Sequence, residues 1–149
     1  MKERTIYVGS DHAGFELKEH IKRFLRKKKF VVEDFGALSF NKDDDYPDFA
    51  KRVAEGVSKD KVKGILVCGT GVGACIVANK FKGVRAALVF DEESAKLSRQ
   101  HNDANVLCLG AWKTSPKKAE KIVTAWLKTK FLKKPRFVRR LKKIRVLGK

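Results

Sequence analysis

The chain has 149 residues and a formal net charge of +18, with 35 Lys and Arg against 17 Asp and Glu. This length fits one domain with a sizeable core, and a hydrophobic content of 43% excludes a disordered chain. No apolar run approaches the ~20 residues of a membrane helix, and the first residues resemble no signal or transit sequence. We therefore predict a single cytoplasmic domain over residues 1–149 that favours anionic partners.

Strand and helix patterns alternate along the chain. Helical spacing of apolar residues begins near Ala13 and recurs after each strand, and a last, basic helix starts near Pro135 and extends the fold. Strands separated by helices predict an α/β fold in which one parallel sheet is covered on both sides. The predicted strands are 5–9, 29–36, 64–68, 84–90 and 105–110, and the helices between and after them are 45–57, 69–81, 91–102 and 115–129.

Ligands of such folds bind beyond the carboxyl ends of the parallel strands. In this chain that edge would hold Asp11 and His12, the run Cys68–Gly73, Asp91 and the run Gly110–Lys113. The sequence therefore predicts a binding crevice built from these segments.

The run Cys68–Gly73 reads CGTGVG and is the strongest local signal. Alternating glycines let the backbone approach a ligand and turn amide groups toward an anion, to which the next helix presents its positive end. A thiol in such surroundings becomes a usable thiolate. Two other interpretations stay open: a buried Cys68 beside a tight turn, and a dinucleotide fingerprint completed by Asp91, ~20 residues further on.

Cysteine, histidine and aspartate residues supply further candidates. Cys68, Cys75 and Cys108 are an odd number of thiols, which fits no closed disulfide framework and no zinc spacing, so we interpret them first as free buried thiols. Asp11 is placed to cap the first helix, with His12 facing the same crevice as Cys68. We predict a solvated His20, a solvated loop at residues 43–45 and no metal site.

Basic residues dominate the end of the chain, where no acidic residue follows Lys128. Arg136 and Arg140 lie one turn apart on the last predicted helix and share a face. Two guanidinium groups on one face can grip a phosphate, although a solvent-facing stripe of charge explains the same pattern.

Four segments resemble the ribose-5-phosphate isomerase B family, which also includes galactose-6-phosphate and allose-6-phosphate isomerases. They read GSDHAGFELK, DYPDFA, CGTGVGACIVANKFKGVRAAL and SRQHNDANVL, in the order and spacing of that family. The resemblance implies a Rossmann-like α/β/α fold and a homodimer, or a tetramer, with sites at the subunit interface. It also implies interconversion of ribose 5-phosphate and ribulose 5-phosphate in the pentose phosphate pathway, without metal or cofactor.

The resemblance further assigns roles to individual residues. Cys68 matches the catalytic base, Thr70 its assistant at the enediolate, and His101 the residue that opens the sugar ring with help from Asp11. Some members use a glutamate as the base, but that position is Ala74 here. The positions that match substrate contacts are His12, Tyr46, Gly69, Gly71, Gly73, Asn102, Arg136 and Arg140.

Two departures from the family pattern lie on the phosphate side. Trp112 stands where the family usually has an arginine, and Phe137 follows Arg136 where the family has a histidine. These changes keep open an isomerase of a six-carbon sugar phosphate. The net charge keeps open a third function, a basic phosphate- or nucleic-acid-binding protein on the same scaffold, although no nucleic-acid recognition motif is present and we do not expect nucleic acid as a partner.

Overall fold

The computed structural model describes residues 2–148, so the two ends of the predicted domain, Met1 and Lys149, lie outside it. A parallel sheet has the strand order β2-β1-β3-β5-β4, and every pairing in it is parallel. The central strands β3 and β5 place Cys68 beside Gly110. The strands are β1 (Thr5–Ser10), β2 (Val31–Asp34), β3 (Lys63–Cys68), β4 (Ala86–Leu88) and β5 (Val106–Gly110).

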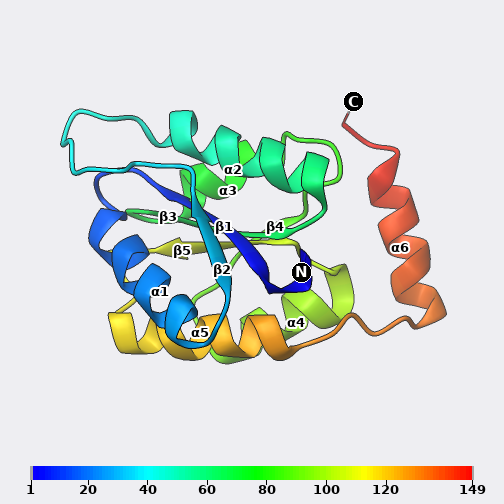
Figure 1. The fold of residues 1–149 in the computed structure, drawn as a ribbon. Helices are drawn as coiled ribbons and strands as arrows, with labels where there is room; N and C mark the ends of the chain where they lie inside the picture. Colours follow the sequence, from blue (N-terminus) through cyan, green and yellow to red (C-terminus); the bar gives the residue numbers. More distant parts are fainter. Residues whose placement is uncertain (1, 149) are drawn as a thin grey trace.

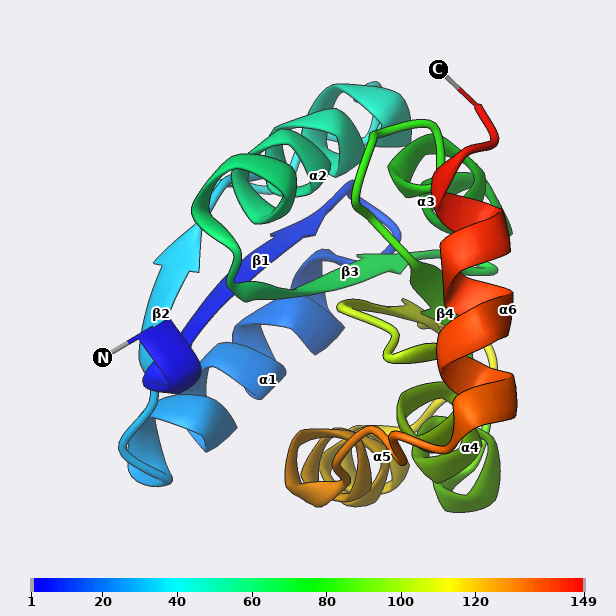
Figure 2. The ribbon, with the colours of Figure 1, turned by 90° about the vertical axis from the view of Figure 1, so that its right-hand side faces the viewer.

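Helices cover both faces of this sheet, as Figures 1 and 2 show. One layer holds α2 (Tyr46–Asp60) and α3 (Val72–Ala78), and the other holds α1 (Phe15–Lys27), α4 (Glu92–Asn102) and α5 (Pro116–Lys128). The predicted three-layer α/β/α fold is therefore confirmed. Within residues 2–148, no helix has the length and apolar character needed to cross a membrane.

Alternating side chains of the central strands divide the core in two. Ile65 and Val67 point toward α1 and α5, whereas Leu66 and Cys68 point toward α2 and α3. Cys108 of β5 lies on the α2–α3 side as well. Burial on both faces explains why these strands are almost wholly apolar.

Some element boundaries differ from the sequence prediction. β2 begins at Val31 and not at residue 29, because Lys29 has a φ of +70° and ends the turn after α1. α3 ends at Ala78, where the chain turns back toward the edge strand β4. β4 itself has three residues because it pairs only with β5.

A buried ion pair joins α1 to the end of β2. The Lys18 ammonium group is 1% exposed and lies 2.7 Å from a carboxylate oxygen of Asp34, which Lys22 also contacts at 2.7 Å. Burial alone would raise the pKa of Asp34, but the hydrogen bonds from Lys18 and Lys22 outweigh it and lower that pKa. This ion pair was not predicted, because Lys18 falls between residues of the apolar stripe.

We expect Asp34→Asn to lower the free energy of unfolding by about 3–5 kcal/mol, because it leaves the buried Lys18 charge with Glu19, 3.4 Å away, in place of its main counterion. The Asp34 pKa is lower in the folded state, so its stabilisation is complete above the unfolded pKa of about 3.9 and is lost as the pH falls through the folded value. Urea unfolding at neutral and acid pH measures both effects. The exposed Asp43→Asn is the control, and an equal loss in both variants would contradict the role of Asp34.

Helix α6 (Pro135–Arg145) stands apart from the layered body, beyond the linker that follows α5 (Figure 1). Phe137 fixes it to α4, since its ring is 4% exposed and its centroid lies 4.6 Å from that of His101. The predicted C-terminal helical extension is confirmed, and most of its surface faces away from the rest of the chain.

Candidate active site

The loop between β3 and α3 surrounds Cys68 with backbone groups. Cys68 is 4% exposed, and its Sγ accepts a hydrogen bond from the Gly71 amide at 3.1 Å. The bond directs the hydrogen of a backbone amide at the Cys68 sulfur. Gly71 has a φ of +80°, and a Cβ there would lie 2.9 Å from the Leu109 carbonyl carbon, so both its conformation and the space require glycine.

Two aromatic side chains enclose this loop. A Cβ on Gly73 would lie 2.4 Å from the ring of Tyr46, and a Cβ on Gly69 would lie 2.6 Å from the ring of Trp112. The missing side chains of Gly69 and Gly73 thus let Tyr46 and Trp112 reach the loop. Thr70 remains exposed between them and accepts a hydrogen bond from the Val72 amide at 3.2 Å.

Asp11 and His12 follow β1 and meet a residue from a distant loop. Asp11 is 6% exposed and accepts a hydrogen bond from the Gly14 amide at 3.0 Å, so it fixes the turn before α1 and does not cap the helix itself. His12 Nδ1 lies 2.7 Å from Oδ1 of Asp44. The predicted solvated loop is therefore wrong for Asp44, whose side chain is 9% exposed.

The titration of these groups reflects their contacts. The hydrogen bond to Asp44 raises the pKa of His12, with smaller support from Asp11. Burial raises the pKa of Asp11, although the Gly14 amide and His12 oppose it. The pair of His12 and Asp44 thus keeps a positive imidazolium over a wider pH range.

Asp11, His12 and Asp44 also form a cluster that offers potential metal ligands, with one donor atom from each within 4.8 Å of the others. All three residues already have partners, since Asp44 bonds His12 and Asp11 bonds the Gly14 amide. A protonated His12 in this arrangement suits an anion better than a metal ion.

Two further residues named in the sequence analysis, His20 and Asp91, have partners outside the Cys68 loop. His20 was predicted to be solvated, but its Nε2 lies 2.6 Å from a carboxylate oxygen of Glu120 on α5. Asp91 caps α4 by accepting a hydrogen bond from the Ser94 amide at 2.7 Å. These contacts hold His20 and Asp91 away from the loop that contains Cys68.

A second group of predicted site residues lies where α4 meets α6. His101 and Asn102 are exposed at the end of α4. The Arg136 guanidinium lies 4.6 Å from the centroid of the Phe137 ring, which also contacts His101. Arg140 follows one turn later on α6 and is exposed.

Two arginines that the sequence did not single out fix the end of α4. Arg99 is 7% exposed and donates to the Asp103 carboxylate at 2.9 Å. Arg85 donates to the backbone carbonyls of Asn102 and Asp103, each at 2.9 Å. These bonds hold the turn after His101 in one conformation.

The two groups lie at opposite ends of the parallel strands: the Cys68 loop at their carboxyl ends, and His101 near their amino ends. Cys68 ends β3 beside Gly110, whereas His101 precedes β5, whose first residue Val106 pairs with Gly64. Along β3, Gly64 and Cys68 are four residues apart, so these two ends are roughly 13 Å from each other. In Figure 1, β5 points to the left and α6 lies at the right. One chain therefore does not bring His101, Asn102, Arg136 and Arg140 to Cys68.

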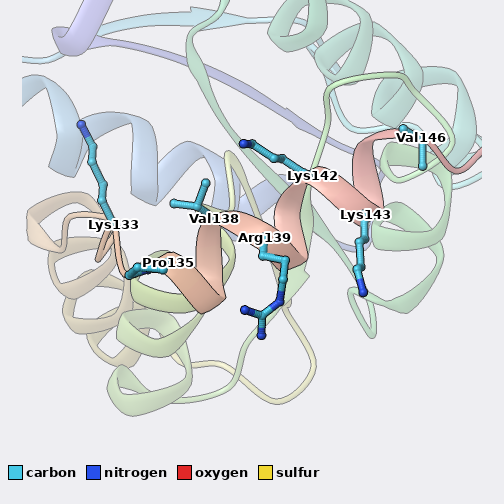
Figure 3. Close-up of a pocket in the computed structure, with 7 residues that line it drawn as sticks. All are labelled: Lys133, Pro135, Val138, Arg139, Lys142, Lys143 and Val146. Atoms are coloured by element: carbon cyan, nitrogen blue, oxygen red, sulfur yellow. The ribbon is translucent and has the colours of Figure 1, made fainter.

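A shallow groove runs along the free face of α6 (Figure 3). Its walls combine apolar side chains with basic ones that extend away from the helix in different directions. The residues that line it are Lys133, Pro135, Val138, Arg139, Lys142, Lys143 and Val146. None of them belongs to the Cys68 loop, so this groove lies outside the crevice at the carboxyl ends of the strands.

Comparison with known proteins identifies the family. Residues 6–144 match the model of the Ribose/Galactose Isomerase family. The chain belongs to this family. It is 51% identical over 129 residues to probable ribose-5-phosphate isomerase B of Mycoplasma genitalium (85% of each chain) and 46% identical over 125 residues to ribose-5-phosphate isomerase B of Escherichia coli (83% of each chain).

A solved structure agrees with these relatives. The structure of Mycoplasma genitalium ribose-5-phosphate isomerase B with bound ribulose-5-phosphate superposes with a TM-score of 0.91, at 48% identity over 95% of this chain and 93% of that one. The predicted relationship to ribose-5-phosphate isomerase B is thus confirmed, and the chain is an enzyme of the isomerase class.

Proposed function

We propose that the whole chain acts as one isomerase domain that interconverts ribose 5-phosphate and ribulose 5-phosphate. The observation that carries this proposal is the buried Cys68 thiol, which receives an amide hydrogen bond inside a glycine loop of an isomerase-family fold. The close relatives named as ribose-5-phosphate isomerases support the choice of substrate.

Cys68 would act as the base. A thiolate there takes the proton from C2 of the open-chain aldose and returns it to C1, and an enediolate forms between these two steps. Negative charge develops on the substrate oxygens, so donors fixed near them lower the barrier. The amides of residues 69–74 and the exposed Thr70 hydroxyl are the candidate donors.

Ring opening and substrate binding would use the remaining site residues. We assign ring opening to His101, with Asp11 assisting, because breaking the hemiacetal requires the anomeric hydroxyl to lose a proton and the ring oxygen to gain one. Tyr46 and Asn102 would contact the sugar. The phosphate would bind to His12, Arg136 and Arg140, which combine an imidazolium with two guanidinium groups.

A complete site would then require two copies of the chain. One copy supplies the Cys68 loop, Asp11, His12 and Tyr46, and the partner copy supplies His101, Asn102 and the two arginines of α6. The opposite positions of these groups in one chain support a homodimer with sites at its interface. The exposed apolar side chains of α6, including Ile144 at 45%, are then covered by the partner copy.

The direct test is conversion of ribose 5-phosphate to ribulose 5-phosphate by the purified protein with a chelator present. We expect turnover to persist, since no step above uses a metal. Allose 6-phosphate assayed in parallel tests the six-carbon alternative that Trp112 and Phe137 keep open. A large preference for the six-carbon sugar would overturn the proposed substrate, and inactivity on both would overturn the proposed function.

The pH dependence of substrate binding tests the role of His12. Its pKa is raised by the hydrogen bond to Asp44, so the imidazolium persists to higher pH than that of an ordinary histidine, and we expect KM to rise as the pH increases through that pKa. Asp44→Asn removes the main cause of the raised pKa and should move the rise in KM to lower pH. The exposed Asp43→Asn is the matched control. Identical KM profiles for all three proteins would contradict a charged His12 at the phosphate.

A further inference from the structure

Trp112 is an aromatic residue beside the Cys68 loop to which the proposed reaction gives no role. It is 70% exposed, whereas the other tryptophan of the chain, Trp126, is fully buried in the core. Exposure alone indicates nothing, since apolar atoms are common at protein surfaces. Trp112 differs from other exposed apolar residues because backbone bonds and ring contacts fix it to the Cys68 loop.

Two backbone hydrogen bonds tie the turn that carries Trp112 to the start of that loop. The Ala111 amide donates to the Cys68 carbonyl at 2.9 Å, and the Trp112 amide donates to the Gly69 carbonyl at 3.0 Å. These bonds continue the contact between β5 and β3 beyond the ends of both strands. The turn and the loop therefore keep one fixed spacing.

The indole ring also packs directly on the loop. A Cβ on Gly69 would lie 2.6 to 2.8 Å from three atoms of the six-membered ring of Trp112. The ring thus touches the Gly69 backbone without a gap, while most of the side chain stays open to solvent. Trp112 is a rigid apolar wall at the residue that follows Cys68.

Further aromatic rings continue this wall toward His12. Trp112 and Phe15 line the same hollow between α1 and the start of α5. The Phe15 ring meets the ring of Phe40 edge-on, with their centroids 6.5 Å apart, and Phe40 meets the His12 ring edge-on at 6.3 Å. An apolar wall therefore extends between Cys68, where the sugar reacts, and His12, which we assign to its phosphate.

Both ends of a substrate held in this way are fixed. The His12 ring and its backbone amide both bond the same oxygen of Asp44, at 2.7 and 2.9 Å, so His12 does not move away freely. A sugar phosphate with one more carbon must then bow outward between Cys68 and His12. The wall cannot retreat from it, because Trp112 is bonded to the Cys68 loop itself.

We propose that Trp112 is a specificity-determining residue, whose indole contacts the C–H groups of the sugar phosphate bound at Cys68 and disfavours chains longer than five carbons. The face of an aromatic ring is partly negative and attracts the partly positive hydrogens of C–H groups. The proposal rests on the proposed function, since it concerns the same substrate at the same thiol.

Tryptophan fluorescence tests the contact without using turnover as its readout. We expect ribose 5-phosphate to cause a saturable change in the emission of the natural chain, and none in Trp112→Phe, which keeps the buried Trp126. Calorimetric titration measures binding of the same sugar phosphate in parallel. Binding without a change in emission would overturn the proposal and leave the proposed function intact. Absence of both binding and turnover would overturn the proposed function, and the proposal with it.

Steady-state kinetics test the specificity. Trp112→Ala should raise KM for ribose 5-phosphate by about 3–10-fold, the loss expected for one aromatic contact, with little change in kcat. Its kcat/KM for allose 6-phosphate relative to ribose 5-phosphate should rise by about 10-fold or more, the usual effect of room for one carbon. Trp112→Phe should restore most of both properties, and Val31→Ala, exposed at the start of β2, is the control. An unchanged preference between the two sugars in Trp112→Ala would overturn the proposal.

The oligomeric state separates contact with the substrate from contact with the partner copy. We expect Trp112→Ala to sediment as the natural chain does. Dissociation of this variant would show that the partner copy covers the indole in place of the substrate, and would overturn the proposal.

Discussion

Cys68→Ala is expected to lower kcat for ribose 5-phosphate by about 10²–10⁴-fold, the usual contribution of a positioned base. The substitution removes the one thiol that lies in the glycine loop and accepts the Gly71 amide hydrogen bond. Substrate binding should change far less, because the groups that we assign to the phosphate lie elsewhere. The loss should therefore appear in kcat and leave KM within a few-fold of its natural value.

Initial rates of ribulose 5-phosphate formation measure this effect, and thermal unfolding shows whether the variant keeps its fold. Cys68→Ser keeps an acceptor for the Gly71 amide and replaces the thiol by a much weaker acid, so its kcat should fall as well. Cys75→Ser controls for the loss of a thiol close by. Activity of Cys68→Ala close to that of the natural chain would rule out Cys68 as the base.

The sequence predicted the fold well because its signals were local. Apolar runs such as residues 64–68 and 105–110 fit only buried strands, and each is followed by a turn or a helix cap that needs no distant partner. Segment ends were less predictable. β4 and β2 are shorter than the predicted segments 84–90 and 29–36, because strand length depends on which neighbour is available for pairing, and that is decided by the whole sheet.

The backbone conformation of the candidate site could be predicted from the sequence, whereas its long-range contacts could not. The glycines of the Cys68 loop are a local pattern, and their need for space is visible in the contacts of Tyr46 and Trp112. The partner of His12 was not predictable, because Asp44 lies 32 residues away in a loop that looked solvated. Burial of Asp44 follows from tertiary packing and leaves no mark in the local sequence.

Phe137 shows how a departure from a family pattern can carry structural information. In the sequence it stands where a polar family residue is expected, which directs attention to the substrate. In the structure its ring packs between His101 and Arg136, and it joins α6 to α4. Its aromatic side chain thus positions two candidate site residues relative to each other, a role that only the arrangement of α4 and α6 discloses.

Mixing two inactive variants is expected to restore activity if the site is shared between copies. Cys68→Ala and His101→Ala should each be nearly inactive alone, since every site in either homodimer lacks one group.

In a mixed dimer, one site carries both substitutions and the other carries neither. Random exchange of equal amounts makes half of the dimers mixed, so about one quarter of the natural activity should return in a two-fold dimer. The measurement is the rate after the two variants are unfolded together and refolded, compared with the same variants refolded separately. Two substitutions on the same group, Cys68→Ala and Tyr46→Ala, provide the control, because every dimer that they form keeps a defect in both sites. Recovery in that control, or no recovery with His101→Ala, would mean that Cys68 and His101 do not meet across an interface. Their positions at opposite ends of the strands would then need another explanation.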